Sequence, residues 1–516
     1  MSNFLFDRDR VFVKDWLKKF DICLNDGALP KNILLKRLNN DSRKICRGDV
    51  FCAVIGTEQD GRKYIDKAIA QGASLIISES QTKEAHGSIT YDGKIGTPII
   101  EFFSLNECLF ELATQFYCSP AKKLKIIGVT GTNGKTSTTQ IIARLSESLG
   151  ISCGVIGTTG YGQLPNLNPL ENTTPGATEL LNILSEFAEQ QVKLVAMEVS
   201  SHAIEQKRVN NQLFKTSVFT NLTRDHLDYH GTMEAYAKAK LGIFSGQQSQ
   251  IAVINSAEKY ALEWALNNAK SADPQPTITI GRDMDITKYP TYVSASNITH
   301  TQTGVAFDLN THQGNFEVKS HLLGDFNVDN LLAAIAVLIA EGIVLKDIVQ
   351  AIQNLNPIIG RMESFSAPHK ATAVVDYAHT PDALENALVA CRQHCPGALW
   401  VVFGCGGNRD AGKRKQMGAI AENCADHVVI TNDNPRNEQP EAIAKDILEG
   451  CKQPEKISVM LDRQKAVISA LTQAKENDLV LLAGKGHEDY IIIGDEQIHY
   501  DERALVRSTY NNEVVM

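Results

Sequence analysis

Short apolar runs alternate with longer amphipathic stretches along most of the chain, and each apolar run ends in a group of polar residues. Apolar runs of roughly four to eight residues with turn residues after them are typical of buried strands, and the stretches between them are long enough for helices. In the first part of the chain, the pattern predicts strands from Asp49 to Val54, Ala73 to Ile77 and Pro98 to Ile100, and helices from Gly61 to Gln71 and Leu105 to Tyr117. The alternation predicts an α/β fold.

The second part of the chain opens on an apolar run, Ile126 and Ile127 with Val129, that leads into a glycine loop and then a helix ending near Leu149 and Gly150. Further strands are predicted from Val192 to Met197 and from Thr216 to Thr220, and further helices from Met233 to Phe244 and from Leu331 to Ile339. Asn327 could cap the last of these helices. Residues 251 to 321 alternate as strands do but carry no recognisable chemistry.

The third part of the chain repeats the strand-and-loop pattern. Strands are predicted from Ala371 to Val375, Leu399 to Phe403, His427 to Ile430 and Leu479 to Leu482. Each ends in a polar or glycine-rich segment, as parallel strands do when their carboxyl ends line a ligand crevice. This part therefore predicts a second doubly wound sheet with a site of its own.

Length and composition narrow the class of protein. A chain of 516 residues is too long for one core, and about three domains are expected. The net charge of −9 argues against general nucleic-acid binding, which needs a surplus of lysine and arginine. The 11 cysteines form no Cys-x-x-Cys pair, which predicts reduced thiols and no zinc site. Without a secretory signal or an apolar segment long enough to span a membrane, the protein is predicted to be cytoplasmic.

The strongest chemical signal is the string TGTNGKTS, Thr130 to Ser137. A strand, a glycine loop and a helix direct backbone N–H groups and a positive helix end at a phosphate. Lys135 would reach the β- and γ-phosphates, and the hydroxyl of Thr136 would bind Mg²⁺. The first glycine of the usual phosphate loop is replaced by Val129. Glycine also collects in ordinary turns, but the flanking strand and helix favour a mononucleotide site.

Two later strand ends could supply further metal ligands. Glu198 follows one strand and His226 follows the next, so both could meet an ion held by Thr136. Mg²⁺ prefers oxygen ligands, which favours Glu198, whereas a histidine in a loop is either a ligand or a solvated residue. On periodicity alone, Lys238 and Lys240 are both solvated helix lysines.

Eight strings in the same order resemble the Mur ligase family, and within it the enzymes that add the third amino acid to the UDP-linked muramoyl dipeptide of peptidoglycan. They are TGTNGKTS, MEVSSH (Met197 to His202), TNLTRDHLDYHG (Thr220 to Gly231), GRME (Gly360 to Glu363), VDYAHTPDAL (Val375 to Leu384), GGNRDAGKR (Gly406 to Arg414), DNPR (Asp433 to Arg436) and GKGHEDY (Gly484 to Tyr490). The resemblance implies an N-terminal UDP-binding domain (1–120), a central ATP-binding domain with a P-loop-type doubly wound parallel sheet (121–355), and a C-terminal Rossmann-like α/β domain that binds the amino acid (356–516).

The resemblance also implies the reaction. ATP phosphorylates a substrate carboxylate, an amine attacks the acyl phosphate, and phosphate leaves, with the third domain closing over the second. The implied catalytic residues are Lys135, Glu198, His226, Lys240 and Arg361. ATP would be bound by Gly131, Thr132, Asn133, Gly134, Lys135, Thr136, Ser137, Asn327, Asn330 at the adenine, Arg361 at the γ-phosphate and Asp376 at the ribose. Lys240 would be carbamylated by CO₂, which only a neutral amine captures, and would hold Mg²⁺ with Thr136, Glu198 and His226.

The other two substrates have implied residues as well. By similarity, the UDP-muramoyl dipeptide would be bound by Ser42, Thr57, Asp60, Gly61, Asn172, Thr173, Thr174, Ser200, Gln206 and Arg208. The amino acid would be bound by Arg409, Asp433, Asn434, Pro435, Arg436, Gly484 and Glu488. By resemblance, family members that take meso-diaminopimelate carry a string like DNPR, whereas lysine-adding members lack its arginine. A guanidinium can bind the distal carboxylate of diaminopimelate, which lysine does not have. Asn-Pro is also a plain turn signal, and Arg436 alone could be a surface charge.

Three other functions share parts of this pattern. A lysine-adding Mur ligase or a folylpolyglutamate synthase would use the same ATP loop and reaction, and a regulatory phosphate-loop ATPase would need the loop alone. The string DNPR favours diaminopimelate. We therefore expect a monomer that uses Mg²⁺ and ATP on small-molecule substrates, with no nucleic acid and no membrane span. His202 and His487 receive no role.

Overall fold

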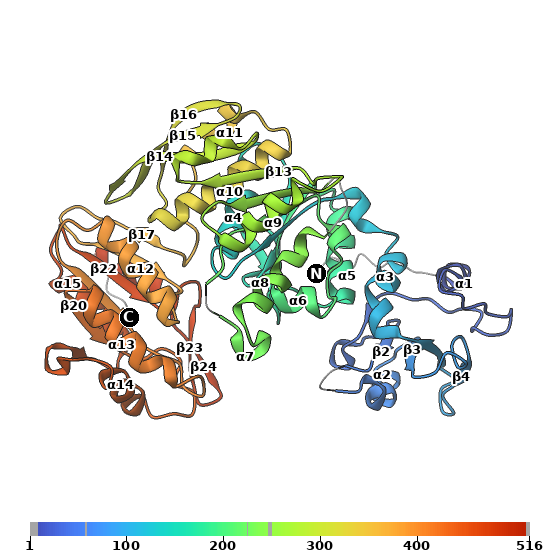
Figure 1. Ribbon diagram of the computed structural model, residues 1–516. Helices are drawn as coiled ribbons and strands as arrows, with labels where there is room; N and C mark the ends of the chain where they lie inside the picture. The colour runs from blue at the N-terminus through green and yellow to red at the C-terminus, as the bar shows by residue number, and fades with distance from the viewer. Residues whose placement is uncertain (1–8, 57–58, 224, 246–249, 512–516) are drawn as a thin grey trace. The chain divides into compact units, whose positions relative to one another are not determined.

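Helices and strands alternate along most of the chain, as the sequence pattern predicts (Figure 1). The computed structural model describes residues 9–56, 59–223, 225–245 and 250–511. The chain divides into two compact units. The first comprises Met1–Thr139, Ser146–Ile254 and Glu258–Thr277, and the second comprises Gln140–Leu145, Asn255–Ala257 and Ile278–Met516.

The first sheet of the first unit has five strands in the order β1-β2-β3-β5-β4. Its elements are α1 (Arg10–Lys18), β1 (Leu38–Asn39), β2 (Val50–Ala53), α2 (Ile65–Ala70), β3 (Leu75–Ser80), β4 (Ile89–Tyr91), β5 (Pro98–Phe103) and α3 (Leu105–Phe116). Only β4 runs antiparallel to its neighbour. Trp16 of α1 packs edge-on against Phe116 of α3 and donates to the carbonyl of Leu112, so the two helices share one buried contact.

The second sheet of the first unit is built around β6 (Lys125–Thr130), in the order β12-β11-β6-β10-β7-β8-β9. Strands β7 (Cys153–Gly157), β10 (Leu194–Glu198), β11 (Thr216–Phe219) and β12 (Ile251–Asn255) are parallel to their neighbours, while β8 (Gly160–Gln163) and β9 (Asn166–Asn168) add an antiparallel edge. The helices between them are α4 (Lys135–Ser148), α5 (Ala177–Glu189), α6 (Ser201–Glu205), α7 (Leu227–His230), α8 (Met233–Leu241) and α9 (Lys259–Asn268).

The second unit begins with strands in the order β16-β15-β14-β13 and two helices that follow them. These are β13 (Thr277–Gly281), β14 (Tyr292–Thr301), β15 (Gly304–Thr311), β16 (Gly314–Ser320), α10 (Asp325–Ala340) and α11 (Leu345–Gln353). From Leu331 to Ile339, helix α10 is apolar on every side and buried. Its first residue is Asp325, and Gly324 precedes it with a φ of +84°, so the prediction that Asn327 caps a later helix is wrong.

The six-stranded sheet of the second unit has the order β17-β18-β22-β19-β20-β21. Its strands are β17 (Glu363–Phe365), β18 (Thr372–Asp376), β19 (Leu399–Phe403), β20 (His427–Ile430), β21 (Ser458–Val459) and β22 (Leu479–Ala483), and its helices are α12 (Pro381–Gln393), α13 (Gly412–Cys424), α14 (Pro440–Leu448), α15 (Arg463–Gln473) and α16 (Glu502–Tyr510). A hairpin of β23 (Tyr490–Ile493) and β24 (Glu496–His499) follows β22. Alternate residues enter two separate cores: Val401 and Phe403 lie in one, and Val402 in the other, so the sheet is covered on both faces.

The α/β fold class is confirmed, with doubly wound parallel sheets in the central and C-terminal parts. The strand-like alternation noted for residues 251 to 321 corresponds to strands that include β14–β16, although their antiparallel pairing was not anticipated, and β8 and β9 were not anticipated at all. Each of the three predicted domain ranges contains a sheet, while the boundaries near residues 120 and 355 stay a prediction. Within the part of the chain that the structure describes, no helix is both long and apolar enough to cross a membrane.

Candidate active site

The phosphate loop leaves β6 and is held by the segment that follows β11. The backbone N–H of Thr132 donates to the Asn221 carbonyl (2.9 Å), and that of Asn133 donates to Asn221 Oδ1 (2.8 Å). The Thr220 hydroxyl donates to the Asn133 carbonyl (2.6 Å). Gly131 has a φ of +145°, and a Cβ there would overlap Thr220 Oγ1. Direct hydrogen bonds therefore join the loop after β6 to the segment after β11.

Two lysine ammonium groups lie on the same loop. Lys135 Nζ donates to the carbonyls of Gly131 and Thr132 (2.9 Å each), and Lys240 Nζ donates to the Gly131 carbonyl (2.8 Å). Lys240 is 2% exposed, whereas Lys238 is exposed on the same helix. Burial, reinforced by the charge of Lys135, holds the pKa of Lys240 well below its usual value. The structure thus distinguishes two lysines that helical periodicity left equivalent.

Glu198 ends β10 as a buried carboxylate. Its Oε1 accepts from the Thr158 N–H (3.0 Å), and its Oε2 accepts from the Thr158 hydroxyl (3.2 Å). A Cβ at Gly157 would overlap this carboxylate, so the glycine leaves the space that the side chain occupies. Thr158, which the sequence analysis missed, fixes the orientation of Glu198 through neutral donors.

His226 lies in a group of aromatic side chains beside the loop. Its ring centroid is 5.1 Å from that of His202 and 6.2 Å from that of Tyr236, and its Nε2 is 3.4 Å from Asp225 Oδ2. The Tyr236 hydroxyl is 3.2 Å from Thr132 Oγ1, and burial raises the pKa of Tyr236 to about 12. Half of the His226 side chain is exposed. Its role as a metal ligand stays a prediction.

The residues predicted for the muramoyl dipeptide meet next to Glu198. The Thr174 hydroxyl donates to the Glu198 carbonyl (2.8 Å) and accepts from the Ser200 N–H (3.0 Å). Arg208 Nη1 donates to the Thr174 carbonyl (3.3 Å), and its Nη2 donates to Gln206 Oε1 (2.5 Å). The Thr173 and Thr158 hydroxyls lie 3.1 Å apart. Five residues chosen by resemblance, Thr173, Thr174, Ser200, Gln206 and Arg208, are thus linked by contacts.

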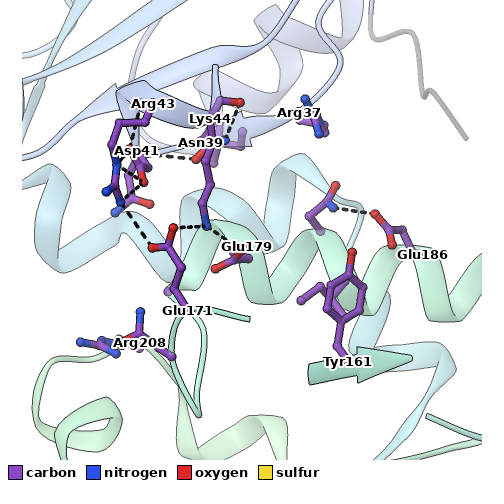
Figure 2. Close-up of a pocket in the computed structure, with 16 residues that line it drawn as sticks. Arg37, Asn39, Asp41, Arg43, Lys44, Tyr161, Glu171, Glu179, Glu186 and Arg208 are labelled. Carbon is purple, nitrogen blue, oxygen red and sulfur yellow. Dashed lines mark hydrogen bonds and ion pairs between the residues drawn. The ribbon is translucent and has the colours of Figure 1, made fainter. Parts of the chain in front are cut away.

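A cavity of about 420 Å³ lies beside this cluster, and Figure 2 shows its polar lining. Asn172 and Arg208 line it, together with Asp41 and Arg43 on either side of the buried Ser42. Arg43 bonds both Asp41 and Glu171. Among the described residues that line the cavity, Asp60 and Gly61 are absent. Asp60 instead caps a short 3₁₀ helix (Gly61–Tyr64), and the Arg62 guanidinium lowers its pKa to about 2; Thr57 lies outside the described residues.

The residues predicted for the nucleoside lie in the second unit, away from the phosphate loop in the chain. In α10, Asn330 Nδ2 donates to Asn327 Oδ1 (3.0 Å), and Asn327 Nδ2 donates to the Leu323 carbonyl (2.9 Å). The Asp376 carboxylate accepts from the N–H groups of Met362 and Ala378 (2.8 Å each). Burial raises the pKa of Asp376, although the charge of Arg361 opposes this.

Arg361 packs its guanidinium over the Tyr377 ring, 4.8 Å from the centroid. Within the described ranges its buried Nε has no hydrogen-bond partner. The Tyr377 ring also lies 5.0 Å from that of His487, whose pKa burial lowers to about 4. Tyr377 and His487 both lie inside strings that the sequence analysis quoted, but neither received a role there.

The residues predicted for the amino acid gather at the ends of β19, β20 and β22. Asn434 Nδ2 donates to Glu488 Oε2 (3.1 Å), and Arg436 Nη1 donates to the Gly407 carbonyl (3.0 Å). A Cβ at Gly406 would lie 3.1 Å from Arg436 Nη1 and 3.7 Å from Arg409 Cγ, so both arginines flank this glycine. Gly484 has a φ of +112° and faces the Asp433 carboxylate. Pro435, which stands between Asn434 and Arg436 in the sequence, is buried. The predicted pocket residues are therefore neighbours.

Three family models match the chain in order. "Mur ligase family, catalytic domain" matches residues 35–117, "Mur ligase middle domain" residues 129–338, and "Mur ligase, glutamate ligase domain" residues 360–486. A protein of Vibrio parahaemolyticus named UDP-N-acetylmuramoyl-L-alanyl-D-glutamate–2,6-diaminopimelate ligase is 45% identical over 92% of this chain and 94% of its own. The chain belongs to the Mur ligase family.

Solved Mur ligase structures agree with this assignment. A structure titled as the same diaminopimelate ligase is 35% identical, covers 96% of this chain and 98% of its own, and has a TM-score of 0.68. The MurF structure from Acinetobacter baumannii is 17% identical, covers 98% and 99%, and has a TM-score of 0.64, which supports the fold alone. As a Mur ligase with three domains, the chain is a ligase that uses ATP as a co-substrate.

The metal that the family implies can be tested against the residues present. In the described ranges, no group of three or more His, Cys, Asp or Glu side chains could hold a metal ion. Mg²⁺ at a nucleotide site needs only one or two protein oxygens, because phosphates and water supply the rest. The buried Glu198 carboxylate and the Thr136 hydroxyl provide that kind of donor, so these residues of the Mur ligase fit the ion.

Proposed function

We propose that this Mur ligase joins meso-2,6-diaminopimelate to UDP-N-acetylmuramoyl-L-alanyl-D-glutamate, using ATP, in the synthesis of peptidoglycan precursors. The single observation that carries the proposal is the cluster in which Arg436 Nη1 donates to the Asn434 carbonyl (3.3 Å) and Asn434 Nδ2 donates to Glu488 (3.1 Å). The guanidinium suits a distal carboxylate, and Glu488 suits the ammonium on the same carbon. The printed name of the Vibrio parahaemolyticus relative supports this choice.

The reaction would proceed in two steps. The glutamate carboxylate takes the γ-phosphoryl group, ADP leaves, and the free amine then attacks the acyl carbon, loses a proton and expels phosphate. Phosphoryl transfer depends on positioning and charge neutralisation, which the loop N–H groups and Lys135 would provide. We place Arg361 at the γ-phosphate, Asp376 at the ribose and Asn330 at the adenine.

Mg²⁺ would be held by Thr136 and Glu198, with His226 and a carbamate on Lys240 as further ligands. The ion would neutralise phosphate charge during transfer. Lys240 supports the carbamate because its amine is buried beside another ammonium and so loses its proton easily. The muramoyl dipeptide would contact Asn172, Thr173, Thr174, Ser200, Gln206 and Arg208, with Ser42 toward the uridine diphosphate.

Product mass tests the proposal directly. With ATP, Mg²⁺ and the UDP-linked dipeptide present, diaminopimelate and lysine are offered together at equal concentration. We expect the diaminopimelate adduct to predominate, because lysine leaves Arg436 without its carboxylate. Predominance of the lysine adduct would favour the lysine-adding alternative. ATP hydrolysis that needs neither the dipeptide nor an amine would instead favour a regulatory ATPase.

We also propose that the protein works in the cytoplasm as a monomer. All 11 cysteines are free, which suits a reducing compartment. Burial raises the pKa of several of these thiols, including Cys405 to about 12, so they are poor nucleophiles and resist oxidation. Cell fractionation and sedimentation would test the compartment and the oligomeric state.

A further inference from the structure

Lys485 is a fully buried cation in the second unit. It lies between Gly484 and Gly486 just after β22, and its side chain is 0% exposed. An ammonium has three N–H donors. Here they go to Asn434 Oδ1 (2.8 Å), the Tyr490 carbonyl (2.8 Å) and Glu488 Oε2 (3.1 Å), so every donor is used.

The charge around Lys485 is incompletely balanced. Asp433 Oδ1 is a fourth neighbour at 3.1 Å, but within the described residues it has no hydrogen-bond partner, since the three donors are already committed. One ammonium therefore faces the two carboxylates of Asp433 and Glu488, and the cluster carries a net charge of −1. Arg436, which lies next to Asn434, and Arg409, which flanks Gly406 with it, add two positive charges, so these five side chains sum to +1.

Lys485 also fixes the Asn434 amide. Asn434 Oδ1 accepts from both Lys485 Nζ (2.8 Å) and the Ile492 N–H (2.9 Å), which leaves Nδ2 to donate to Glu488 Oε2. With no cation at Lys485, the amide could flip and the Glu488 carboxylate would lose two of its donors. Lys485 and Asn434 therefore hold one oxygen of Glu488, while the Tyr377 hydroxyl donates to the other, Oε1 (3.5 Å).

We infer that Lys485 is a positioning residue that sets the choice between diaminopimelate and lysine, an inference that rests on the proposed function. The distal end of diaminopimelate is a zwitterion, with one carboxylate and one ammonium, whereas that of lysine is a cation. A surplus of one positive charge around the site favours an end that carries a carboxylate. Loss of Lys485 would remove this surplus, weaken the attraction for the distal carboxylate of diaminopimelate and reduce the repulsion of the cationic amine of lysine.

The test compares kcat/KM for diaminopimelate and for lysine in the full-length enzyme and in Lys485→Met. We expect the ratio to fall by about tenfold or more, mainly through a higher KM for diaminopimelate, with the KM for ATP unchanged. General loosening of the pocket would lower both values together and leave the ratio unchanged. An unchanged ratio in a folded variant would overturn the inference.

Two further variants keep the test decisive. Lys485→Gln keeps a hydrogen-bond donor but removes the charge, and it should also lower the ratio of kcat/KM for diaminopimelate to that for lysine. This variant provides the test if Lys485→Met does not fold. The double change Lys485→Met with Asp433→Asn restores the wild-type net charge of the site and should recover part of the ratio, which a packing role would not predict.

A control variant and the kcat/KM ratio of the wild-type enzyme separate this inference from the proposed function. Lys465→Met is the control: it removes a lysine charge from an exposed ion pair with Asp462 at the start of helix α15. It should leave the ratio of the two kcat/KM values unchanged. A wild-type enzyme that prefers lysine would overturn both the function and the inference. A wild-type enzyme that prefers diaminopimelate, with Lys485 variants that keep the same ratio, would overturn the inference alone.

Discussion

Lys240 and Lys485 are both buried, but their surroundings differ. Lys240 donates to one carbonyl of the phosphate loop, and the ammonium of Lys135 donates to the same oxygen. Lys485 is surrounded by Asp433 and Glu488 and by two further acceptors. Burial penalises an ammonium unless carboxylates compensate for the lost water.

The difference separates a reactive lysine from a structural one. The lowered pKa of Lys240 makes its neutral amine accessible, which is the form that takes up CO₂. The ammonium of Lys485 is held by opposite charge, and its contribution is to orient Asn434 and Glu488. Substituting each lysine in turn therefore tests the distinction: the change at Lys240 should mainly lower turnover, and the change at Lys485 should mainly lower the free energy of unfolding.

The largest expected effect is on turnover. Lys240→Met should lower the rate of product formation by roughly a thousandfold, because it removes the amine on the phosphate loop that is proposed to carry the carbamate. Steady-state assays with saturating substrates measure this. Lys238→Met, two residues away on the exposed face of α8, is the matched control and should be near wild type. Equal losses in both variants would show that α8 itself had been disturbed.

The next effect is on stability and has the opposite pattern. Lys485→Met should lower the free energy of unfolding by about 3–5 kcal/mol, because it leaves two buried carboxylates without their cation. Lys240→Met should cost less than about 1 kcal/mol, since no carboxylate loses a partner there. Denaturant unfolding of the two variants measures the contrast. Equal destabilisation would remove the distinction between the two lysines.

Many of the strands and helices that carry these lysines were predictable from the sequence. Strands β19 and β20 have the predicted bounds, because continuous apolar runs flanked by turns leave few alternatives. Helix α10 was misplaced at its start, because the positive φ of Gly324 is set by tertiary packing and has no signature in the apolar pattern.

The individual site side chains were harder to predict. Periodicity assigns Lys240 to a helix but not to the phosphate loop, which lies more than a hundred residues earlier in the chain. Lys485 was inside a quoted string together with its partners Glu488 and Tyr490, yet its third partner, Asn434, comes from a separate segment. Such roles depend on which segments meet in space, so resemblance supplied most of the site and geometry supplied the partners.

Arg436 extends the comparison to a third cation, one that donates to backbone carbonyls and yet remains charged, since guanidinium does not lose its proton in proteins. Arg436→Ala should raise the KM for diaminopimelate about 10- to 100-fold while leaving the KM for ATP unchanged. Arg436→Lys should recover little, because an ammonium lacks the bidentate fork. Arg392→Ala, an exposed arginine paired with Asp426, is the control. Full recovery by lysine would point to charge alone.

A smaller effect concerns the pH dependence of stability. The unfolded chain binds a proton at Lys240 near pH 10.5, while the native lysine binds it only at lower pH. Between the two pKa values the unfolded state holds more protons, so native stability should rise with pH, by at most about 1.4 kcal/mol per pH unit. Unfolding in CO₂-free buffer at two alkaline pH values measures the slope. Lys240→Met should flatten it, and an unchanged slope would contradict the lowered pKa.

The smallest effect is expected at the surface. Lys465 pairs with Asp462 at 3.1 Å, three residues away on the first turn of α15, and its side chain is 76% exposed. Water screens such a pair, so Lys465→Met should change the free energy of unfolding by about 0.5 kcal/mol or less. The same chemical change is thus made at three depths: on the surface, beside carbonyls at Lys240, and among carboxylates at Lys485. A loss at Lys465 as large as that at Lys485 would mean that the charge, and not the buried partners, accounts for the stability.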